Sequence, residues 1–155
     1  MISPETLRRY PEFGPFTDDQ LREIAMIAVE TTAEENEVIF EECGPADALY
    51  LLLEGSVDLS YKSQEEYHPK ASKVFSVGEI NPGEIFSLSS LIEPYVLNAT
   101  ATASKPCKMV KIEAKALRQL LENDPSMGYA MMQQIIKAMM ERLIYTRVQL
   151  AAAWA

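Results

Sequence analysis

The sequence has no long hydrophobic run, although 48% of its residues are hydrophobic. A helix that crosses a bilayer needs about 20 consecutive apolar residues, and the longest run here is only a few residues. The first residues, 1–5, also lack the basic and apolar regions of a signal peptide. We therefore expect no membrane association and a cytoplasmic location.

Basic residues are also scarce. The 14 lysines and arginines stand against 23 aspartates and glutamates, which gives a formal net charge of -9 at pH 7 and an isoelectric point of about 4.6. Such a surface repels the phosphate backbone and offers no basic stripe along which a nucleic acid would bind. The composition argues against nucleic acid as a partner.

Histidine and glycine-rich motifs are nearly absent, and this limits the chemistry available to the chain. The single histidine, His68, lies in a polar stretch. No nucleophile–base arrangement, phosphate-binding glycine loop or metal-ligand spacing is recognisable in the sequence. Paired glutamates such as Glu41 and Glu42 are typical of a solvated face. We expect no enzyme activity, no catalytic residue, no metal site and no cofactor.

The two cysteines, Cys43 and Cys107, are isolated from one another and from other metal-ligating residues. In a chain without an export signal, reduced thiols are expected rather than a disulfide. The acidic neighbours of Cys43 disfavour a reactive thiolate. A turn residue is therefore the first interpretation of Cys43, and a redox-sensing thiol is the alternative.

At 155 residues the chain is long enough for one well-cored domain. Its hydrophobic periodicity divides it into a helical segment over 1–30, a strand-rich segment over 31–112 and a second helical segment over 113–155. Within the first segment, Thr17 followed by Gln20 predicts a capping box at a helix start. We expect these segments to form a single domain of residues 1–155.

The middle segment alternates as short strands do. Val57, Leu59 and Tyr61 are separated by polar residues, which is typical of a strand with one buried face. Several such runs are separated by glycine, proline and asparagine turns, and this predicts a sandwich or jelly-roll barrel. The polar stretch 63–72 is predicted to be an exposed hairpin loop. The fold class is therefore α+β, a jelly-roll β-barrel with N-terminal helices and a long C-terminal helix.

The last segment predicts a short helix over 115–122 and a long helix that is capped by Ser126. Along the long helix, apolar residues recur at alternating intervals of four and three, which is a heptad pattern. The residues of the predicted dimer seam are Met139, Leu143, Thr146 and Leu150. We expect the first half of this helix to lie on the barrel and the second half to pair with a second copy, as a homodimer. Burial of the whole helix within one chain is the alternative.

Two stretches carry a resemblance to a known family. They are Pro82-Gly83-Glu84-Ile85-Phe86-Ser87-Leu88-Ser89-Ser90-Leu91 and Leu97-Asn98-Ala99-Thr100. Together with 36–57 they resemble the cyclic nucleotide-binding domain of catabolite-activator-type regulators and of the protein kinase A regulatory subunit. That family has a phosphate-binding cassette that begins Phe-Gly-Glu and is followed later by Pro-Arg-(Ser/Ala)-Ala-Thr. The resemblance covers almost the whole chain and implies the same order of helix, barrel and long helix.

The resemblance fails at the positions that bind the ligand. In the family, the glutamate accepts a hydrogen bond from the ribose and the arginine pairs with the cyclic phosphate. Here the glutamate position is Leu88, the arginine position is Leu97, and Ser87 stands in place of the glycine. Leucine offers neither donor nor acceptor, and a phosphate buried without a counter-charge costs several kcal/mol. The resemblance therefore implies the fold without the usual ligand chemistry.

The candidate ligand-binding residues are those of the cassette region. They are Phe86, Ser87, Leu88, Ser89, Ser90, Leu97, Asn98, Ala99 and Thr100. The resemblance implies a short helix after the phenylalanine, so that serines at its start and Asn98 supply hydrogen bonds to a small, less charged ligand. The alternative is a pocket closed by Leu88 and Leu97.

Three functions are compatible with these features. The first is a non-enzymatic regulatory or sensor module that binds cAMP and cGMP weakly or not at all and has an unidentified small-molecule ligand. The second is a true cyclic nucleotide-binding protein that uses backbone amides and serine and asparagine contacts. The third is a ligand-independent dimerisation or docking protein. The helix-turn-helix domain of related transcription regulators is not expected, because the sequence ends at Ala155, where that domain would begin.

Overall fold

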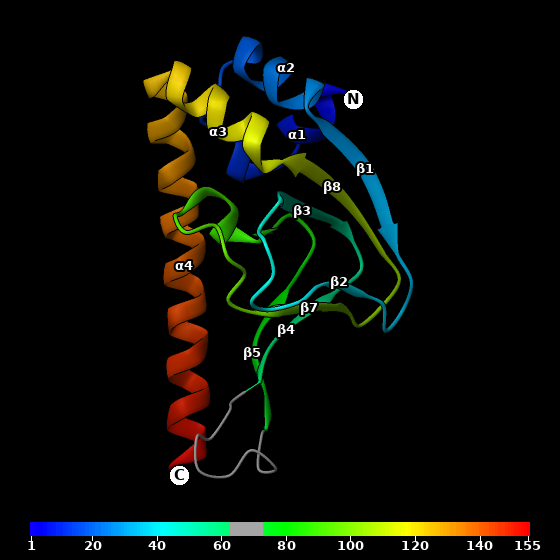
Figure 1. Ribbon diagram of the computed structural model, residues 1–155, viewed down its shortest axis with the longest axis vertical. Helices are drawn as coiled ribbons and strands as arrows, with labels where there is room; N and C mark the ends of the chain where they lie inside the picture. The colour runs from blue at the N-terminus through cyan, green and yellow to red at the C-terminus, as the bar shows by residue number, and fades with distance from the viewer. Residues whose placement is uncertain (63–72) are drawn as a thin grey trace.

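The computed structural model describes residues 1–62 and 73–155, which form two packed β-sheets with helices at one end and along one side (Figure 1). The elements in chain order are α1 (Pro4–Arg8), η1 (Pro11–Phe13), α2 (Asp18–Met26), β1 (Ala28–Ala33), β2 (Val38–Phe40), β3 (Ala48–Glu54), β4 (Val57–Lys62), β5 (Val74–Ile80), β6 (Ile85–Phe86), η3 (Leu88–Leu91), β7 (Thr100–Ala103), β8 (Cys107–Glu113), α3 (Ala114–Asn123) and α4 (Pro125–Ala153). The predicted loop over 63–72 and His68 lie outside the described residues.

The two sheets are antiparallel and have four strands each. One has the order β1-β8-β3-β6 and the other the order β2-β7-β4-β5. Apolar side chains from both sheets, such as Leu52 of β3, Leu59 of β4 and Met109 of β8, share one buried cluster between them. The predicted α+β jelly-roll with N-terminal helices and a long C-terminal helix is confirmed.

The boundaries of the helical and strand-rich segments differ from the prediction. The capping box of α2 is present, because the Thr17 hydroxyl oxygen accepts a hydrogen bond from the Gln20 amide (3.2 Å) and the Gln20 side chain accepts one from the Thr17 amide (3.0 Å). The first helical segment was predicted to reach residue 30, but β1 begins at Ala28, since its backbone pairs with β8. β8 in turn extends to Glu113, so the last helical segment begins one residue later than predicted.

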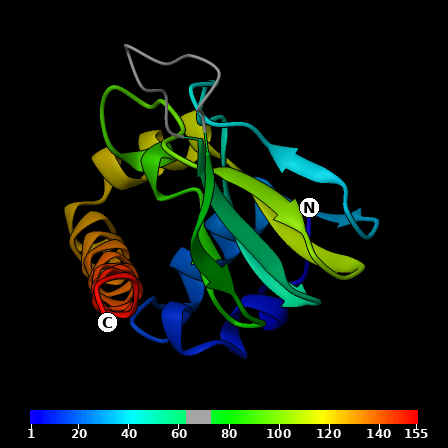
Figure 2. The ribbon, with the colours of Figure 1, turned by 90° about the horizontal axis from the view of Figure 1, so that it is seen from below.

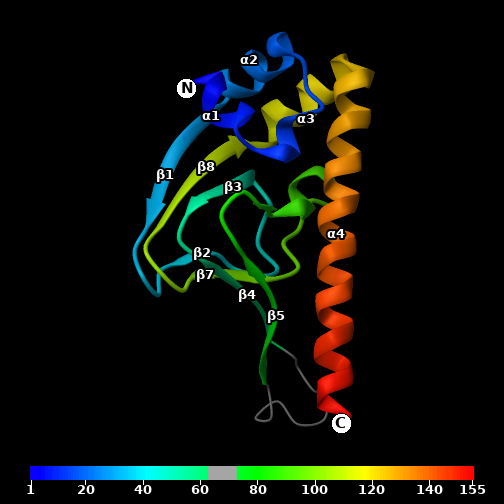
Figure 3. The same cartoon turned by 180° about the vertical axis from the view of Figure 1, so that it is seen from behind.

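The long helix α4 runs along one side of the molecule. In Figures 1 and 3 it lies beside the sheets, with α1, α2 and α3 gathered near its first turns, and Figure 2 shows it end-on next to the strands. Met127, Met131 and Ile135 bury its first turns in the core. The sequence predicted Ser126 as the cap, but the cap is Asp124, whose side chain accepts a hydrogen bond from the Met127 amide (3.2 Å). The helix therefore begins at Pro125. Proline has no backbone N–H, and this costs nothing in the first turn, where N–H groups have no acceptor within the helix.

Asp124 also links α4 to α2, and the contribution of its carboxylate to stability should depend on pH. The second carboxylate oxygen accepts a hydrogen bond from the Gln20 side chain (2.9 Å), and this bond, followed by the bond from Met127, lowers the pKa of Asp124 below its ordinary value of 3.8. A carboxylate whose pKa is lowered by folding stabilises the protein above its unfolded-state pKa, and this stabilisation is lost as the pH falls through the folded-state pKa.

We therefore expect Asp124→Ala to lower the free energy of unfolding at neutral pH, and the difference from the wild type to shrink below about pH 4. Urea denaturation at several pH values measures this difference. A difference that stays constant into strong acid would contradict the expectation, because the carboxylate would then contribute nothing through its ionisation.

Gly55 turns the chain between β3 and β4 with φ 100°. A Cβ at this position would meet the Pro106 carbonyl oxygen and lie 2.8 Å from the sulfur of Cys107. Left-handed strain and these contacts together predict that Gly55→Ala lowers the free energy of unfolding by about 2 kcal/mol. Gly78→Ala is the matched control, because a Cβ there would lie 3.5 Å from the Leu59 side chain, an ordinary contact. Equal urea midpoints for the two variants would contradict this prediction.

Candidate ligand-binding site

The cassette region begins at a backbone conformation that glycine normally favours. Ser87 follows β6 with φ 64° and ψ 48°, in the left-handed region, and η3 begins at the next residue. Glycine enters this region without a steric cost, whereas serine is uncommon there. Cys43 has the same kind of backbone, with φ 71°, whereas the neighbouring Gly44 has no positive φ. Both residues therefore stand at turns that the family pattern builds with glycine.

A cavity of about 250 Å³ lies between the cassette region, the barrel and α4. We call it the cassette cavity. The cassette supplies Ser87, Leu88, Ser89, Leu97, Asn98 and Ala99 to its wall, and α4 supplies Ile135, Ile136, Met139 and Arg142. The wall is mostly apolar, with neutral polar groups on the cassette side and one guanidinium on the α4 side. These residues are far apart in the sequence and meet only because α4 packs back on the barrel.

Leu88 and Leu97 both line the cassette cavity, at 5% and 6% exposure. The backbone of Leu97 is fixed on both sides, since its amide donates to the Gly44 carbonyl (2.8 Å) and its carbonyl accepts from the Cys43 amide (2.7 Å). Two apolar side chains thus stand where the family pattern has its glutamate and arginine. A cavity of about 250 Å³ remains beside them in the structure.

Three of the predicted cassette residues do not line the cavity. Phe86 is fully buried and stacks on Tyr50, with ring centroids 5.1 Å apart. Ser90 is also fully buried, and its hydroxyl oxygen has no hydrogen-bond partner among the described residues. The hydroxyl oxygen of Thr100 accepts a hydrogen bond from the Glu42 amide (3.0 Å). In the structure these side chains hold the fold around the cavity and do not form its surface.

Arg118 of α3 holds the cassette in place, and the sequence analysis did not identify it. Its guanidinium donates to the Ser90 carbonyl (2.6 Å) and lies over the Tyr95 ring, 3.8 Å from the centroid. A hydrogen bond from a charged donor is stronger than a neutral one, and the cation–π contact adds a further attraction. Arg118 therefore ties η3 to the segment that leads to Leu97.

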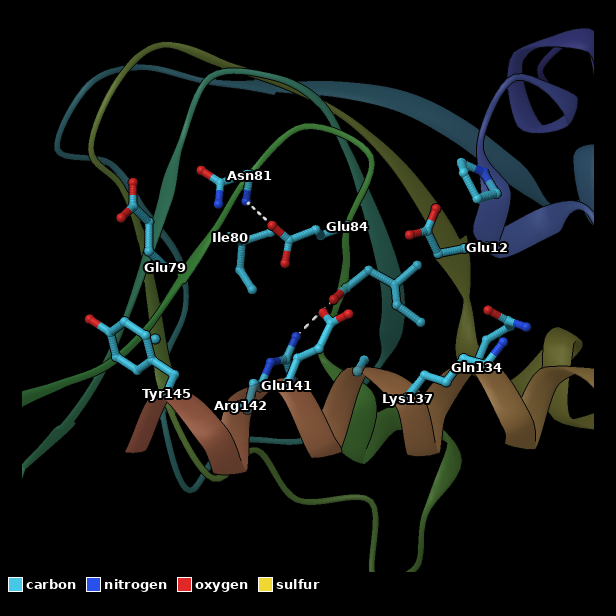
Figure 4. A pocket seen from close by; sticks show the side chains of 14 residues that line it. Glu12, Glu79, Ile80, Asn81, Glu84, Gln134, Lys137, Glu141, Arg142 and Tyr145 are labelled. Carbon is cyan, nitrogen blue, oxygen red and sulfur yellow. Dashed lines mark hydrogen bonds between the residues drawn. The ribbon is translucent and has the colours of Figure 1, made fainter. Parts of the chain in front are cut away.

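Arg142 of α4 is a second residue that the sequence analysis missed. Its guanidinium donates to the Ile85 carbonyl (2.7 Å), as Figure 4 shows, and forms no ion pair among residues 1–62 and 73–155. Burial lowers the pKa of Arg142, while Glu84 and Glu141 act in the opposite direction. An arginine remains protonated at neutral pH in spite of such a shift. A positive charge therefore lies on the α4 side of a cavity whose cassette side is uncharged.

The predicted dimer seam is exposed along α4. Met139, Leu143 and Leu150 are 47%, 60% and 60% exposed, and the Thr146 hydroxyl donates to the Arg142 carbonyl (2.9 Å). Further exposed apolar residues form a second row, which consists of Ile136, Met140, Ile144 and Val148. Because they are spaced by four residues, this row starts next to the seam and winds away from it around the helix. We call the two rows together the α4 stripe. It is wider than the seam predicted from the heptad pattern, and it is not buried within the described part of the chain.

Other kinds of site have little support in the described residues. Cys43 is exposed and Cys107 is buried, and both are free thiols. Within residues 1–62 and 73–155, no three histidine, cysteine or acidic side chains gather closely enough to hold a metal ion. No described helix combines the length and the apolar character that crossing a membrane requires.

Comparison with known proteins assigns the family. Residues 30–124 match the model of the cyclic nucleotide-binding domain. The chain belongs to this family. A crystal structure of a protein from Geobacter metallireducens, assigned as cyclic nucleotide-binding, is 40% identical, has a TM-score of 0.80, and covers 92% of this chain and 99% of its own. The N-terminal domain of a transcriptional regulator from Streptomyces coelicolor is 27% identical, with a TM-score of 0.67 over 87% of this chain and 92% of its own.

A more distant structure shares the fold alone. The regulatory domain of Toxoplasma gondii protein kinase A, crystallised with cAMP, is 16% identical, has a TM-score of 0.69, and covers 81% of this chain and 46% of its own. No curated protein matches the chain. This cyclic nucleotide-binding domain thus has a left-handed turn at Ser87 and places the side chains of Leu88 and Leu97 in the wall of the cassette cavity.

Proposed function

We propose that this cyclic nucleotide-binding domain is a non-enzymatic regulatory module that senses a small ligand other than cAMP or cGMP. The observation that carries the proposal is the position of Leu88 and Leu97 in the wall of the cassette cavity. A cyclic phosphate placed against Leu97 would lose its hydration without gaining a counter-charge there. At about 250 Å³ the cavity lies just below the range typical of drug-sized ligands, so it suits a small molecule.

A second candidate is a true cyclic nucleotide-binding protein that uses neutral contacts. Ser87, Ser89 and Asn98 line the cavity and supply hydroxyl and amide groups. Neutral hydrogen bonds contribute about 0.5–1.5 kcal/mol each, which is less than a charge-assisted pair with a phosphate contributes. This candidate therefore predicts weak binding of cAMP or cGMP at best, unless a charge outside the cassette takes part.

Titration calorimetry with cAMP and cGMP separates the two candidates. We expect no binding at micromolar concentrations, because the loss of the phosphate pair and the ribose hydrogen bond removes roughly 3–6 kcal/mol, or two to four orders of magnitude in affinity. Sub-micromolar binding of either nucleotide would replace the first candidate by the second.

The α4 stripe supports the proposal that two copies of the chain pair along this helix. Ile136 and Met139 belong both to the stripe and to the wall of the cassette cavity. A ligand that contacts these side chains therefore changes the surface on which two copies would pair. A dimer whose stability does not change with any cavity ligand would instead favour the third candidate, a ligand-independent dimerisation or docking protein.

A further inference from the structure

Arg142 lines two cavities of different character. The first is the cassette cavity. The second has a volume of about 350 Å³ and lies between α4, η1 and β5. Figure 4 looks into this second cavity, where Glu12 approaches from the N-terminal segment, Glu84 lies above α4, and Arg142 rises from α4 toward the barrel. A ligand in either cavity could therefore contact the side chain of Arg142.

The charges of the second cavity disfavour an anion. Its wall carries four carboxylates and, besides Arg142, one other cation. The carboxylates are Glu12, Glu79, Glu84 and Glu141, and the other cation is Lys137. The cassette cavity has no carboxylate in its wall. Like charges repel more strongly in a partly buried site than in water. An anion drawn to Arg142 therefore fits on the cassette side.

The hydrogen bonds of Arg142 leave room for such an anion. A guanidinium has five N–H donors, and the described structure accounts for one bond, from Nη2 to the Ile85 carbonyl (2.7 Å). No carboxylate among residues 1–62 and 73–155 forms an ion pair with it. Burial lowers the pKa of Arg142, and Glu84 and Glu141 lie near enough to act against this shift, but neither forms an ion pair with it among the described residues. An anionic ligand in the cassette cavity would supply a directly bonded counter-charge to this partly buried cation.

We propose that Arg142 is the counter-charge for the ligand of the cassette cavity, and that this ligand is a small amphipathic carboxylate. The inference rests on the proposed function and names its ligand class. The carboxylate accepts hydrogen bonds from the guanidinium fork, whose planar geometry matches two carboxylate oxygens. The apolar body lies along Leu88, Leu97, Ile135 and Met139, which line the same cavity. Arg142 supplies a positive charge from α4, at a different place in the cavity wall from Leu97, where the family pattern has its arginine.

Octanoate is the probe for this inference, and 1-octanol is its neutral analogue of the same length. We expect octanoate to bind the wild type more tightly than octanol does in titration calorimetry. Arg142→Gln should weaken octanoate binding by roughly tenfold to a hundredfold, because a charge-assisted hydrogen bond is lost, and should leave octanol binding unchanged. Arg142→Lys should keep the preference for octanoate over octanol.

Lys137→Gln is the matched control. It removes the same charge from the same helix, but Lys137 lines the second cavity and not the cassette cavity. Octanoate affinity should not change in this variant. Octanol binding by Arg142→Gln checks that the cavity survives the loss of the bond to the Ile85 carbonyl.

Equal binding of octanoate and octanol by the wild type would overturn the inference without recourse to any variant. So would the absence of octanoate binding at millimolar concentrations, or an octanoate affinity that Arg142→Gln and Lys137→Gln lower to the same extent. If octanol still binds when one of these results is obtained, only the ligand class is wrong, and the proposed function is retained. Sub-micromolar binding of cAMP or cGMP that displaces both probes would overturn the proposed function as well.

Discussion

Leu88→Glu combined with Leu97→Arg is expected to give this chain an affinity for cAMP that the wild type lacks. The glutamate restores an acceptor for the ribose hydroxyl, and the arginine restores a charge-assisted pair with the cyclic phosphate. Both side chains enter the cassette cavity from the positions that Leu88 and Leu97 now occupy. The gain should be roughly 3–6 kcal/mol, which corresponds to two to four orders of magnitude in affinity. Titration calorimetry of the double variant with cAMP measures it.

Leu88→Gln combined with Leu97→Gln is the control for this experiment. It places polar side chains of similar length at the same positions but restores neither charge, so we expect no comparable gain. Thermal unfolding shows whether each variant remains folded, since polar groups at sites only 5% and 6% exposed lower stability. A folded double variant that does not bind cAMP at millimolar concentrations would show that the cassette no longer presents these side chains to a nucleotide.

The parts of the fold that the sequence predicted are those encoded by local patterns. The capping box at Thr17 and the alternation of Val57 and Leu59 each depend on residues close together in the chain. The cassette was located from its motif, and most of its predicted residues line one cavity. The early start of β1 at Ala28 was missed, because its pairing with β8 is decided by residues far along the chain.

The parts of the site that the sequence did not predict depend on tertiary contacts. Arg118 and Arg142 lie on helices outside the motif and reach the cassette region only through packing. Their spacing along α3 and α4 gives no signal that would distinguish them from arginines on a solvated face. Ser90 and Thr100 lie inside the motif, yet their side chains do not reach the cavity surface, because the direction of each side chain is set by η3 and β7.

The α4 stripe predicts a dimer in solution. Met139, Leu143 and Leu150 are each close to or above half exposed, and the row from Ile136 to Val148 widens the apolar surface beside them. A helix that leaves such a surface in water gains free energy by pairing with its own copy, and a two-fold axis brings the same stripe of both copies together. The Thr146 hydroxyl donates to a backbone carbonyl of its own helix, so this seam position contributes little to the pairing.

Leu143→Glu is expected to raise the dimer dissociation constant by about a thousandfold, or about 4 kcal/mol, because two-fold symmetry places the new charge in the interface twice. Gln149→Glu is the matched control. Gln149 is exposed, lies one heptad after Arg142 and belongs to neither apolar row, so the same charge there should leave the dimer intact. Sedimentation equilibrium at several concentrations measures both constants.

The pattern of variants also locates the axis of the pair. If the copies meet along the predicted seam, Leu150→Glu should dissociate the dimer as strongly as Leu143→Glu, and Met140→Glu should have a smaller effect. If they meet along the row from Ile136 to Val148, the order is reversed, because a heptad-spaced seam and a row spaced by four residues diverge around the helix. A wild-type mass of one chain at tens of micromolar would contradict both arrangements. The stripe would then have to be covered by a different protein, since so large an apolar surface is rarely left exposed on a monomer.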